Sequence, residues 1–367
     1  MSKNEFSVEQ LKSAIKERNA KWTPHETPLT RLTATEQMAR LGFLPTDVEL
    51  RLVAELNLDK PDLKTHKVEF KVVHVEGAPT RMDWRNVNGQ NYTTPIRDQD
   101  GCGSCVAFGT IAALEALVKI KVAGAAAAPD YSEAHLLFCG GGSCNGWHMD
   151  AACNYLQGNG VPDEACFPYS QGLAKRTCAT CADWKSRIGP TQIQGWSNTK
   201  DIAQMKNNIS ENCPQITGMA VYNDFFSYAG GVYEHVSGDL AGYHCVAIVG
   251  YDDSAGCWIC KNSWGTSWGE SGWFRIKYGQ CGIQDVFGMW NMTLKPPAKS
   301  EGWAEHVLVD YSFAGARTLW AYTEGAWRYK PLTDAEIASI AKIVMEAGKV
   351  YVWWNPSNVL TMVRTWK

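Results

Sequence analysis

The sequence of 367 residues lacks the features that assign a chain to a membrane or to a nucleic acid. No stretch of 18 apolar residues is free of charge, since the longest candidate, 110–129, contains one glutamate and two lysines, which argues against a transmembrane helix. The formal net charge is only −3, so there is no electrostatic reason to expect nucleic acid or an anionic membrane as a partner. Repeats and low-complexity tracts are also missing. With 45% hydrophobic residues, the chain is expected to bury a full core and to hold more than one domain.

The segment 1–5 lacks the apolar core of a secretory signal. The thirteen cysteines nevertheless indicate an oxidising compartment, because a reducing cytosol does not maintain structural disulfides. An odd number leaves at least one thiol free or paired with another molecule, as a catalytic cysteine would be. We therefore expect a secreted protein, in an extracellular or a lysosome- or vacuole-like compartment, with the signal peptide absent from this sequence or with export by another route.

Two distant stretches supply the residue types of a nucleophilic site. The first is QDGCGSC, which ends at Cys105 and leads into an apolar run. The second places His244 in an apolar stretch and Asn262 at the start of Asn-Ser-Trp-Gly. A thiol, an imidazole and an amide are what a Cys-His-Asn site requires. His244 and Asn262 follow Cys105 by 139 and 157 residues, against roughly 130–150 in the known signature, so the second spacing is slightly too long.

Each residue of this pattern has a chemical task. A neutral thiol is a poor nucleophile, so Cys105 must be held as a thiolate, by the N-terminus of a helix and by the imidazolium of His244. Asn262 would bond to the other ring nitrogen and fix the imidazole plane, and Trp264 would cover that bond. Gln99 and the backbone N–H of Cys105 would stabilise the oxyanion of a tetrahedral intermediate.

These residues resemble the papain family of cysteine peptidases over about residues 79–293. The resemblance is carried by the following motifs: Asp83-Trp84-Arg85, Pro95-Ile96-Arg97-Asp98-Gln99, Cys102-Gly103-Ser104-Cys105, Cys144-Asn145-Gly146, Phe167-Pro168-Tyr169, His244 and Asn262-Ser263-Trp264-Gly265-Thr266-Ser267-Trp268-Gly269. It implies Cys105 as nucleophile, His244 as general base and acid, Asn262 as the residue that orients the imidazole, and Gln99 as oxyanion donor. It also implies an α+β, two-lobed fold with a helical left lobe and a β-barrel-like right lobe.

The resemblance further implies a Cys102–Cys144 disulfide and a second one from Cys139 to Cys178 or Cys181. Neither a metal nor an organic cofactor is implied.

The substrate-binding positions that match the family are Gly146, Trp147, Met149, Cys245, Val286 and Trp264. The apolar side chains at Met149, Cys245 and Val286 indicate a pocket for a bulky hydrophobic side chain, one residue before the scissile one. Three positions depart from the family pattern. Val106 replaces the usual Trp after the nucleophile, Cys245 replaces a small residue, and Trp147 replaces a Gly, so we expect the Trp147 side chain to narrow or reshape the cleft.

The secondary-structure pattern agrees with an α+β chain. Helices are expected from Cys105 and around 134–137 and 149–156, and strands over 218–222, 246–250, 258–261 and 272–277. Residues 78–295 would then form the catalytic domain, with its cleft between the two halves.

Residues 1–77 are predicted to form helices followed by a strand over 68–73. Capping boxes at Ser7 and Thr33 mark two helix starts. By position the segment resembles a propeptide that occupies the cleft until it is cut. A free N-terminal interaction domain is the alternative.

After a Pro-rich linker, residues 296–367 are predicted to form a small ββαββ domain. Its hairpins would use 319–323 with 326–329 and 350–354 with 359–364, around a helix over 333–348. We expect its tryptophans to form core rather than a ligand groove; they are Trp320, Trp327, Trp353 and Trp354.

Other functions fit the sequence less well. Three Cys-x-x-Cys pairs, at 102–105, 178–181 and 257–260, match zinc or redox sites only in part, because their separation exceeds seventy residues. A transglutaminase-type acyltransferase and a silent papain-like scaffold remain alternatives. The expected protein is a monomeric cysteine endopeptidase made as a zymogen, with a peptide substrate, its own propeptide as inhibitor, and no nucleic-acid or membrane partner. An exopeptidase is possible if a segment blocks one end of the cleft.

Overall fold

The computed structural model describes residues 7–60, 63–66, 75, 78–295, 301–304, 306–311, 317–323, 326–332, 349–354 and 360–366. The chain divides into two compact units, 1–295 and 296–367. The strand expected over 68–73, the helix over 333–348 and the last hairpin turn lie outside the described residues.

Three helices near the N-terminus begin at capping boxes. In each box a Ser or Thr hydroxyl accepts the N–H of the third helical residue, whose Gln or Glu side chain bonds back to the cap. The boxes expected at Ser7 and Thr33 are confirmed, and a third at Thr46 was missed. The helices of the first unit are α1 (Val8–Glu17), α2 (Ala34–Met38), α3 (Asp47–Glu55), α4 (Cys105–Val118), α5 (Met149–Asn159), α6 (Tyr169–Lys175) and α7 (Ile202–Glu211).

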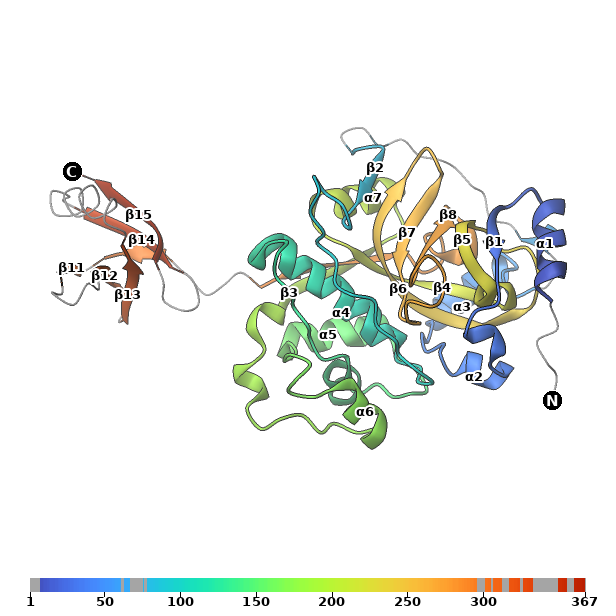
Figure 1. The fold of residues 1–367 in the computed structure, drawn as a ribbon, viewed down its shortest axis with the longest axis horizontal. Coiled ribbons are helices and arrows are strands. Elements are labelled where there is room, and N and C mark those ends of the chain that lie inside the picture. The colour runs from blue at the N-terminus through green and yellow to red at the C-terminus, as the bar shows by residue number, and fades with distance from the viewer. Residues whose placement is uncertain are drawn as a thin grey trace. The chain divides into compact units, whose positions relative to one another are not determined.

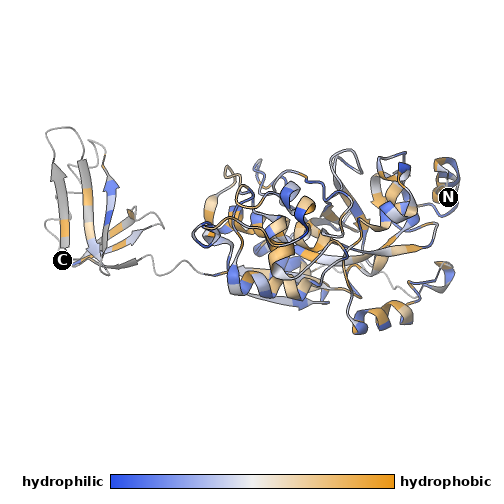
Figure 2. Ribbon diagram, turned by 90° about the horizontal axis from the view of Figure 1, so that it is seen from below, coloured by the Kyte–Doolittle hydropathy of each residue, from blue (hydrophilic) through white to orange (hydrophobic). Residues whose placement is uncertain are grey.

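Helix α4 is the central helix of the unit and begins at Cys105, as predicted. It is hydrophobic on all sides, so it is buried at nearly every position. Its N-cap, Ser104, makes no capping bond with its side chain, which leaves the first N–H groups of the helix to interact with the Cys105 thiol. Figure 2 shows hydrophobic residues along the helices and strands in the middle of this unit.

The strands form one large, mostly antiparallel sheet. In spatial order they are β1, β5, β8, β7, β6, β4, β9 and β3, and β2 pairs with β6. Helices α4, α5 and α6 lie together on one side of the unit and the central strands on the other (Figure 1). The α+β, two-lobed architecture is therefore confirmed. The strands are β1 (Lys21–Pro24), β2 (Arg81–Asp83), β3 (Ile193–Thr199), β4 (Gln215–Tyr222), β5 (Tyr228–Tyr233), β6 (Leu240–Asp252), β7 (Cys257–Lys261), β8 (Trp273–Lys277) and β9 (Met289–Leu294).

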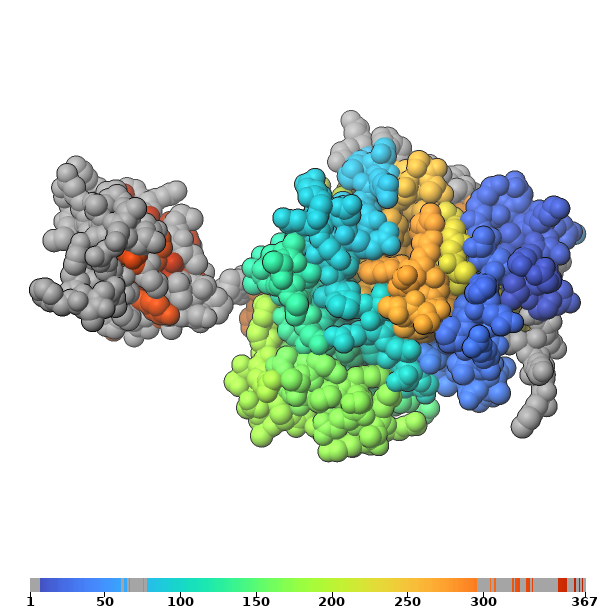
Figure 3. Space-filling model, in the orientation of Figure 1, coloured from blue at the N-terminus to red at the C-terminus, as the bar shows by residue number. Residues whose placement is uncertain are grey.

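The N-terminal segment is built into this sheet. Strand β1 pairs antiparallel with β5, with Trp22 opposite Gly231. Only glycine fits at Gly231, because its φ is +94° and an added Cβ would lie 2.3 Å from the Lys21 carbonyl oxygen. Figure 3 shows the N-terminal residues lying against the strands of the right lobe. The sequence analysis did not predict this pairing.

The second unit contains two three-stranded sheets, β10–β14–β15 and β11–β12–β13. Its core includes Leu319, Val352 and Trp354, while Trp353 is half-buried. The structure adds β10 and β11 to the hairpins expected from the sequence. The strands are β10 (Glu301–Trp303), β11 (His306–Tyr311), β12 (Arg317–Thr323), β13 (Ala326–Pro331), β14 (Lys349–Trp354) and β15 (Leu360–Trp366).

Candidate active site

Three elements bring the candidate catalytic residues together. Cys105 opens α4, His244 lies in β6, and Asn262 directly follows β7, the antiparallel neighbour of β6. The backbone N–H of Cys245 donates to Cys105 Sγ over 3.4 Å, so the residue after His244 touches the thiol. All three catalytic candidates are buried.

The imidazole of His244 is oriented by Asn262. His244 Nε2 lies 2.8 Å from Asn262 Oδ1. An amide oxygen only accepts, so Nε2 carries the proton and, in the neutral ring, Nδ1 is left with a lone pair. The Trp264 ring covers this pair, with its centroid 4.7 Å from that of the imidazole. His244 Nδ1 makes no hydrogen bond in the described part of the chain, so the direct Cys105–His244 bond is not formed in this structure.

The nucleophile and the base are both neutral here. Burial raises the pKa of the Cys105 thiol to about 11, although N–H groups of Cys245, Gly42 and Val106 favour the thiolate. Burial also lowers the pKa of His244 to about 4. The hydrogen bond to Asn262 raises this pKa, but burial has the larger effect. The closed structure therefore holds a thiol beside an uncharged imidazole rather than an ion pair.

The side chain of Gln99 is held from several directions. Its Oε1 accepts from Ser263 Oγ at 2.6 Å, and its Nε2 donates to the Cys102 carbonyl at 2.8 Å. The hydroxyl of Tyr169 donates to the Gln99 carbonyl at 2.8 Å. Gln99 Nε2 also donates to the Arg40 carbonyl at 3.0 Å. The Arg40 carbonyl of the N-terminal segment thus accepts a hydrogen bond from the amide group that is expected to donate to the oxyanion.

Residues 40–44 of the N-terminal segment lie in the cleft. Gly42 accepts from the Trp147 N–H at 2.8 Å, and the Leu44 N–H donates to the Trp147 carbonyl at 3.0 Å. Phe43 N–H donates to the Tyr243 carbonyl at 3.3 Å, so the segment is bonded to both lobes. Gly42 has no room for a side chain, because an added Cβ would lie 1.8 Å from the carbonyl oxygen of Gly103.

The Trp147 side chain, which was expected to narrow or reshape the cleft, is buried. Trp147 is 5% exposed, and its ring packs on the backbone of Gly140 and Gly142, where an added Cβ would approach it to 2.5 and 2.8 Å. Two glycines make room for the ring on the inner side of the lobe. The backbone of Trp147, next to Gly146, bonds to Gly42 and Leu44 in the cleft.

The Phe43 side chain fills an apolar pocket. Its ring lies against Gly218, where an added Cβ would be 2.2 Å from Phe43 Cε1, and meets Phe287 edge-on with the ring centroids 5.3 Å apart. The three residues that the resemblance implied for a specificity pocket belong to the same apolar cluster as Phe43; they are Met149, Cys245 and Val286. Gly218 and Phe287 were missed, because no local motif marks them.

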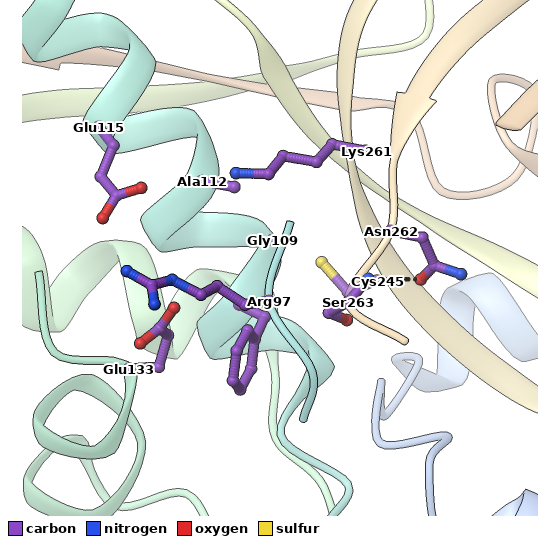
Figure 4. A pocket seen from close by; sticks show the side chains of 10 residues that line it. Arg97, Gly109, Ala112, Glu115, Glu133, Cys245, Lys261, Asn262 and Ser263 are labelled. Atoms are coloured by element: carbon purple, nitrogen blue, oxygen red, sulfur yellow. Dashed lines mark hydrogen bonds between the residues drawn. The ribbon is translucent and has the colours of Figure 1, made fainter. Parts of the chain in front are cut away.

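A small polar cavity lies between the lobes, behind the nucleophile. Figure 4 shows Lys261 extending toward Ala112 on α4, with Glu115, Arg97 and Glu133 together on the other side of Ala112; Asn262 also lines the cavity. Lys261 Nζ donates to Thr94 Oγ1 at 2.8 Å, and that hydroxyl donates to Glu115 at 2.5 Å. Burial lowers the pKa of Lys261 to about 8 and raises that of Glu115. This chain of bonds joins the strand before Asn262 to the helix of Cys105.

Three disulfides lie in the left lobe. Cys102 is bonded to Cys144, as the resemblance implied, and Cys139 is bonded to Cys178 rather than to Cys181. Cys181 is instead joined to Cys166, a pair that the sequence analysis did not identify. Seven cysteines remain free and buried; they are Cys105, Cys153, Cys213, Cys245, Cys257, Cys260 and Cys281.

The described residues contain no group of three or more side chains suited to hold a metal ion. None of their helices has the length and apolar character needed to cross a bilayer.

Comparison with known proteins supplies relatives for this architecture. The family model "Papain family cysteine protease" matches residues 78–289. The chain is 36% identical over 202 residues to "Cathepsin B-like CP2" of Giardia intestinalis, covering 52% of this chain and 67% of that protein. It is 34% identical over 234 residues to "Cathepsin Z" of Onchocerca volvulus, and the match covers 58% of this chain and 75% of that protein.

Solved proenzymes match a longer part of the chain. "Recombinant stem bromelain precursor" is 27% identical with a TM-score of 0.58, covering 78% of this chain and 87% of the precursor. The digestive procathepsin L2 of Tenebrio molitor has the same fold, with 24% identity and a TM-score of 0.60, covering 78% and 89%.

Proposed function

This chain belongs to the papain family of cysteine proteases and is a peptidase proenzyme, and we propose that Cys105, His244, Asn262 and Gln99 are its catalytic residues. The observation that carries the proposal is the meeting of α4 with β6, where the N–H of Cys245 touches the Cys105 thiol. The Asn262-oriented imidazole supports it, because Nδ1 is the nitrogen left to take a proton.

The reaction follows from these groups. The imidazole Nδ1 takes the thiol proton, and the thiolate attacks the peptide carbonyl carbon to form a C–S bond. The oxyanion accepts hydrogen bonds from Gln99 Nε2 and the N–H of Cys105. The imidazolium protonates the departing amine as the C–N bond breaks, which leaves a thioester. His244 then activates water, which hydrolyses the thioester and restores Cys105.

We propose residues 1–77 as the propeptide, 78–295 as the catalytic domain and 296–367 as a separate C-terminal domain. Inhibition is supported by Arg40, whose carbonyl takes the donor that an oxyanion needs, and by Gly42, whose backbone covers the thiol. Removal of this segment admits water and substrate, and the thiol and imidazole can then form their ion pair. An autonomous N-terminal interaction domain is disfavoured by its strand in the catalytic sheet.

The pocket filled by Phe43 is proposed to take the substrate side chain one residue before the scissile one. Because Gly218 has no side chain, the pocket has room for a large ring, and Phe287 forms an aromatic wall. Both features favour a bulky hydrophobic side chain. Profiling with a peptide library tests this, and Gly218→Val should shift the preference toward smaller side chains. A wild-type preference for Arg or acidic residues would contradict the assignment.

The decisive experiment compares the full chain with Cys105→Ala. At mildly acidic pH with a thiol reductant, loss of residues 1–77 is followed on gels while hydrolysis of a peptide amide is measured. Wild-type activity should rise as the segment is lost, and the variant should show none. Unchanged activity in Cys105→Ala refutes the catalytic assignment, and activity that is already maximal before cleavage argues against the propeptide.

Two other classes predict different outcomes. A transglutaminase-type enzyme would transfer the acyl group to an added amine in preference to water, and a silent scaffold would show no turnover. We also propose an extracellular or lysosome-like compartment, because the three disulfides need oxidising conditions.

A further inference from the structure

A second free thiol lies beside the nucleophile. The N–H of Cys245 bonds to Cys105 Sγ, and the Cys245 sulfur packs on α4 at Gly109, where an added Cβ would lie 3.0 Å from it. Gly109 is one helical turn beyond Cys105, on the same face of the helix. The two cysteines come from segments 140 residues apart, yet the fold brings them into contact.

The geometry brings the two sulfurs within reach of each other. Because an N–Cα bond is about 1.46 Å long, the 3.4 Å contact keeps the Cα of Cys245 within about 4.9 Å of Cys105 Sγ. Cys245 and Gly109 both line the small cavity between the lobes, next to Asn262 and Ser263. To form a disulfide, the Cys245 side chain would rotate about χ1 until its sulfur meets that of Cys105.

We propose that Cys245 is the resolving thiol of a reversible oxidation of Cys105, with hydrogen peroxide as the oxidant. The proposal rests on Cys105 being the reactive nucleophile of the processed enzyme. The Cys105 thiolate attacks peroxide, so that an S–O bond forms, the O–O bond breaks and hydroxide leaves. The Cys245 thiolate then attacks this sulfenic sulfur, an S–S bond forms, and hydroxide leaves with the oxygen.

The two sulfurs together lose the two electrons that peroxide gains. A dithiol reductant returns them by exchange and regenerates both thiols. The disulfide protects the nucleophile, because a sulfenic acid left without a partner is oxidised further to sulfinic acid, which a dithiol does not reduce. This reversible oxidation is confined to the processed enzyme, because Cys105 is fully buried under Gly42 in the proenzyme and peroxide cannot reach it.

Cys153 supplies a matched control. It is a free, fully buried thiol in the same core as Cys245. A thiolate at Cys153 would repel a thiolate at Cys245 and so raise the pKa of Cys245. No contact joins Cys153 to Cys105 among those that the structure describes. Cys153→Ala therefore removes a neighbouring thiol without removing the proposed partner of Cys105.

The test starts from the full chain, allows residues 1–77 to be removed, exposes the processed enzyme to hydrogen peroxide without reductant and then adds dithiothreitol. Peptide mapping by mass spectrometry follows the state of Cys105, and each variant's activity is normalised to its own untreated value. Wild type and Cys153→Ala should form a Cys105–Cys245 disulfide, lose activity, and regain most of it. Cys245→Ala should lose activity and fail to regain it, with Cys105 found as sulfinic acid.

Several results would overturn the proposal. They are the absence of the Cys105–Cys245 disulfide from oxidised wild type, full recovery of Cys245→Ala, or a Cys105–Cys153 disulfide in its place. If Cys245→Ala does not fold, the peptide map of wild type decides by itself. If the untreated protein hydrolyses no peptide, the proposed function fails, but the same map still decides on the disulfide.

Discussion

At the level of single residues, the side-chain N–H₂ group of Gln99 connects inhibition with catalysis. It donates to the carbonyl groups of Arg40 and Cys102. In the proenzyme the group donates to the Arg40 carbonyl, while Ser263 and Cys102 hold the amide in place. A donor fixed before the reaction requires no reorganisation when an oxyanion forms.

Gln99→Ala should therefore lower the kcat of the processed enzyme by about 10²–10³-fold, the usual cost of one oxyanion donor. Steady-state kinetics on a peptide amide measures this. Gln99→Glu keeps the size of the side chain but places an acceptor at the oxyanion, so it should be at least as damaging. Wild-type kcat in both variants would remove Gln99 from the oxyanion site.

The ionisation of Cys105 should depend on the propeptide. With a pKa of about 11 in the proenzyme, the thiol is protonated at neutral pH and becomes a thiolate only as the pH rises. Alkylation of Cys105 by iodoacetamide should therefore be very slow in the uncut chain at neutral pH, because the thiol is both buried and protonated and the thiolate is the reactive form.

In the processed enzyme the same reaction should already be fast at pH 6, where His244 can pair with the thiolate. Mass spectrometry of the peptide containing Cys105 reports both rates. Alkylation of the uncut chain as fast as that of the processed enzyme would mean that the thiol is already ionised and accessible beneath the propeptide.

At the level of elements, the N-terminal segment is joined to the enzyme at two places. Strand β1 extends the sheet through β5, and residues 40–44 bond to Trp147 and Tyr243 in the cleft. Backbone hydrogen bonds contribute to both contacts, and the Phe43 side chain adds an apolar contact in the cleft.

Gly42→Val should release the cleft segment, because a Cβ at this position would overlap the Gly103 carbonyl. The expected result is peptidase activity in the uncut chain and faster loss of residues 1–77, measured against wild type. Gly101→Ala is the control, since an added Cβ there meets nothing within 4 Å. Normal latency of Gly42→Val would show that β1 alone suffices for inhibition.

At the level of the whole molecule, the chain has separate cores. One surrounds α4 and α5, a second is the aromatic cluster of the central strands, and a third belongs to residues 296–367. The third core contains no residue of the catalytic unit.

Leu319→Ala should therefore destabilise the C-terminal unit by about 2–5 kcal/mol, the usual cost of removing a buried leucine side chain. Leu319 is 1% exposed. Calorimetry should show one transition shifted, with kcat/KM on a peptide unchanged. The same substitution at the exposed Leu50 should change stability by at most about 0.5 kcal/mol. A fall in activity that parallels the lost stability would show that the two units depend on each other.

Local patterns in the sequence were sufficient for the start of α4, two of the three N-terminal capping boxes and the order of the catalytic candidates. Helix starts and alternating strands depend on neighbouring residues, so they can be inferred without coordinates. The Cys102–Cys144 bond came from the family resemblance, as did the roles of Cys105, His244, Asn262 and Gln99.

Only the tertiary structure decided what occupies the cleft. The Arg40 carbonyl at Gln99, the Phe43 ring at Gly218, the inward turn of Trp147 and the partner of Cys139 all depend on contacts between distant segments. The neutral state of Cys105 is also a consequence of burial under such a segment. Contacts of this kind leave no periodicity in the sequence, because each depends on which backbone approaches which after the lobes have packed.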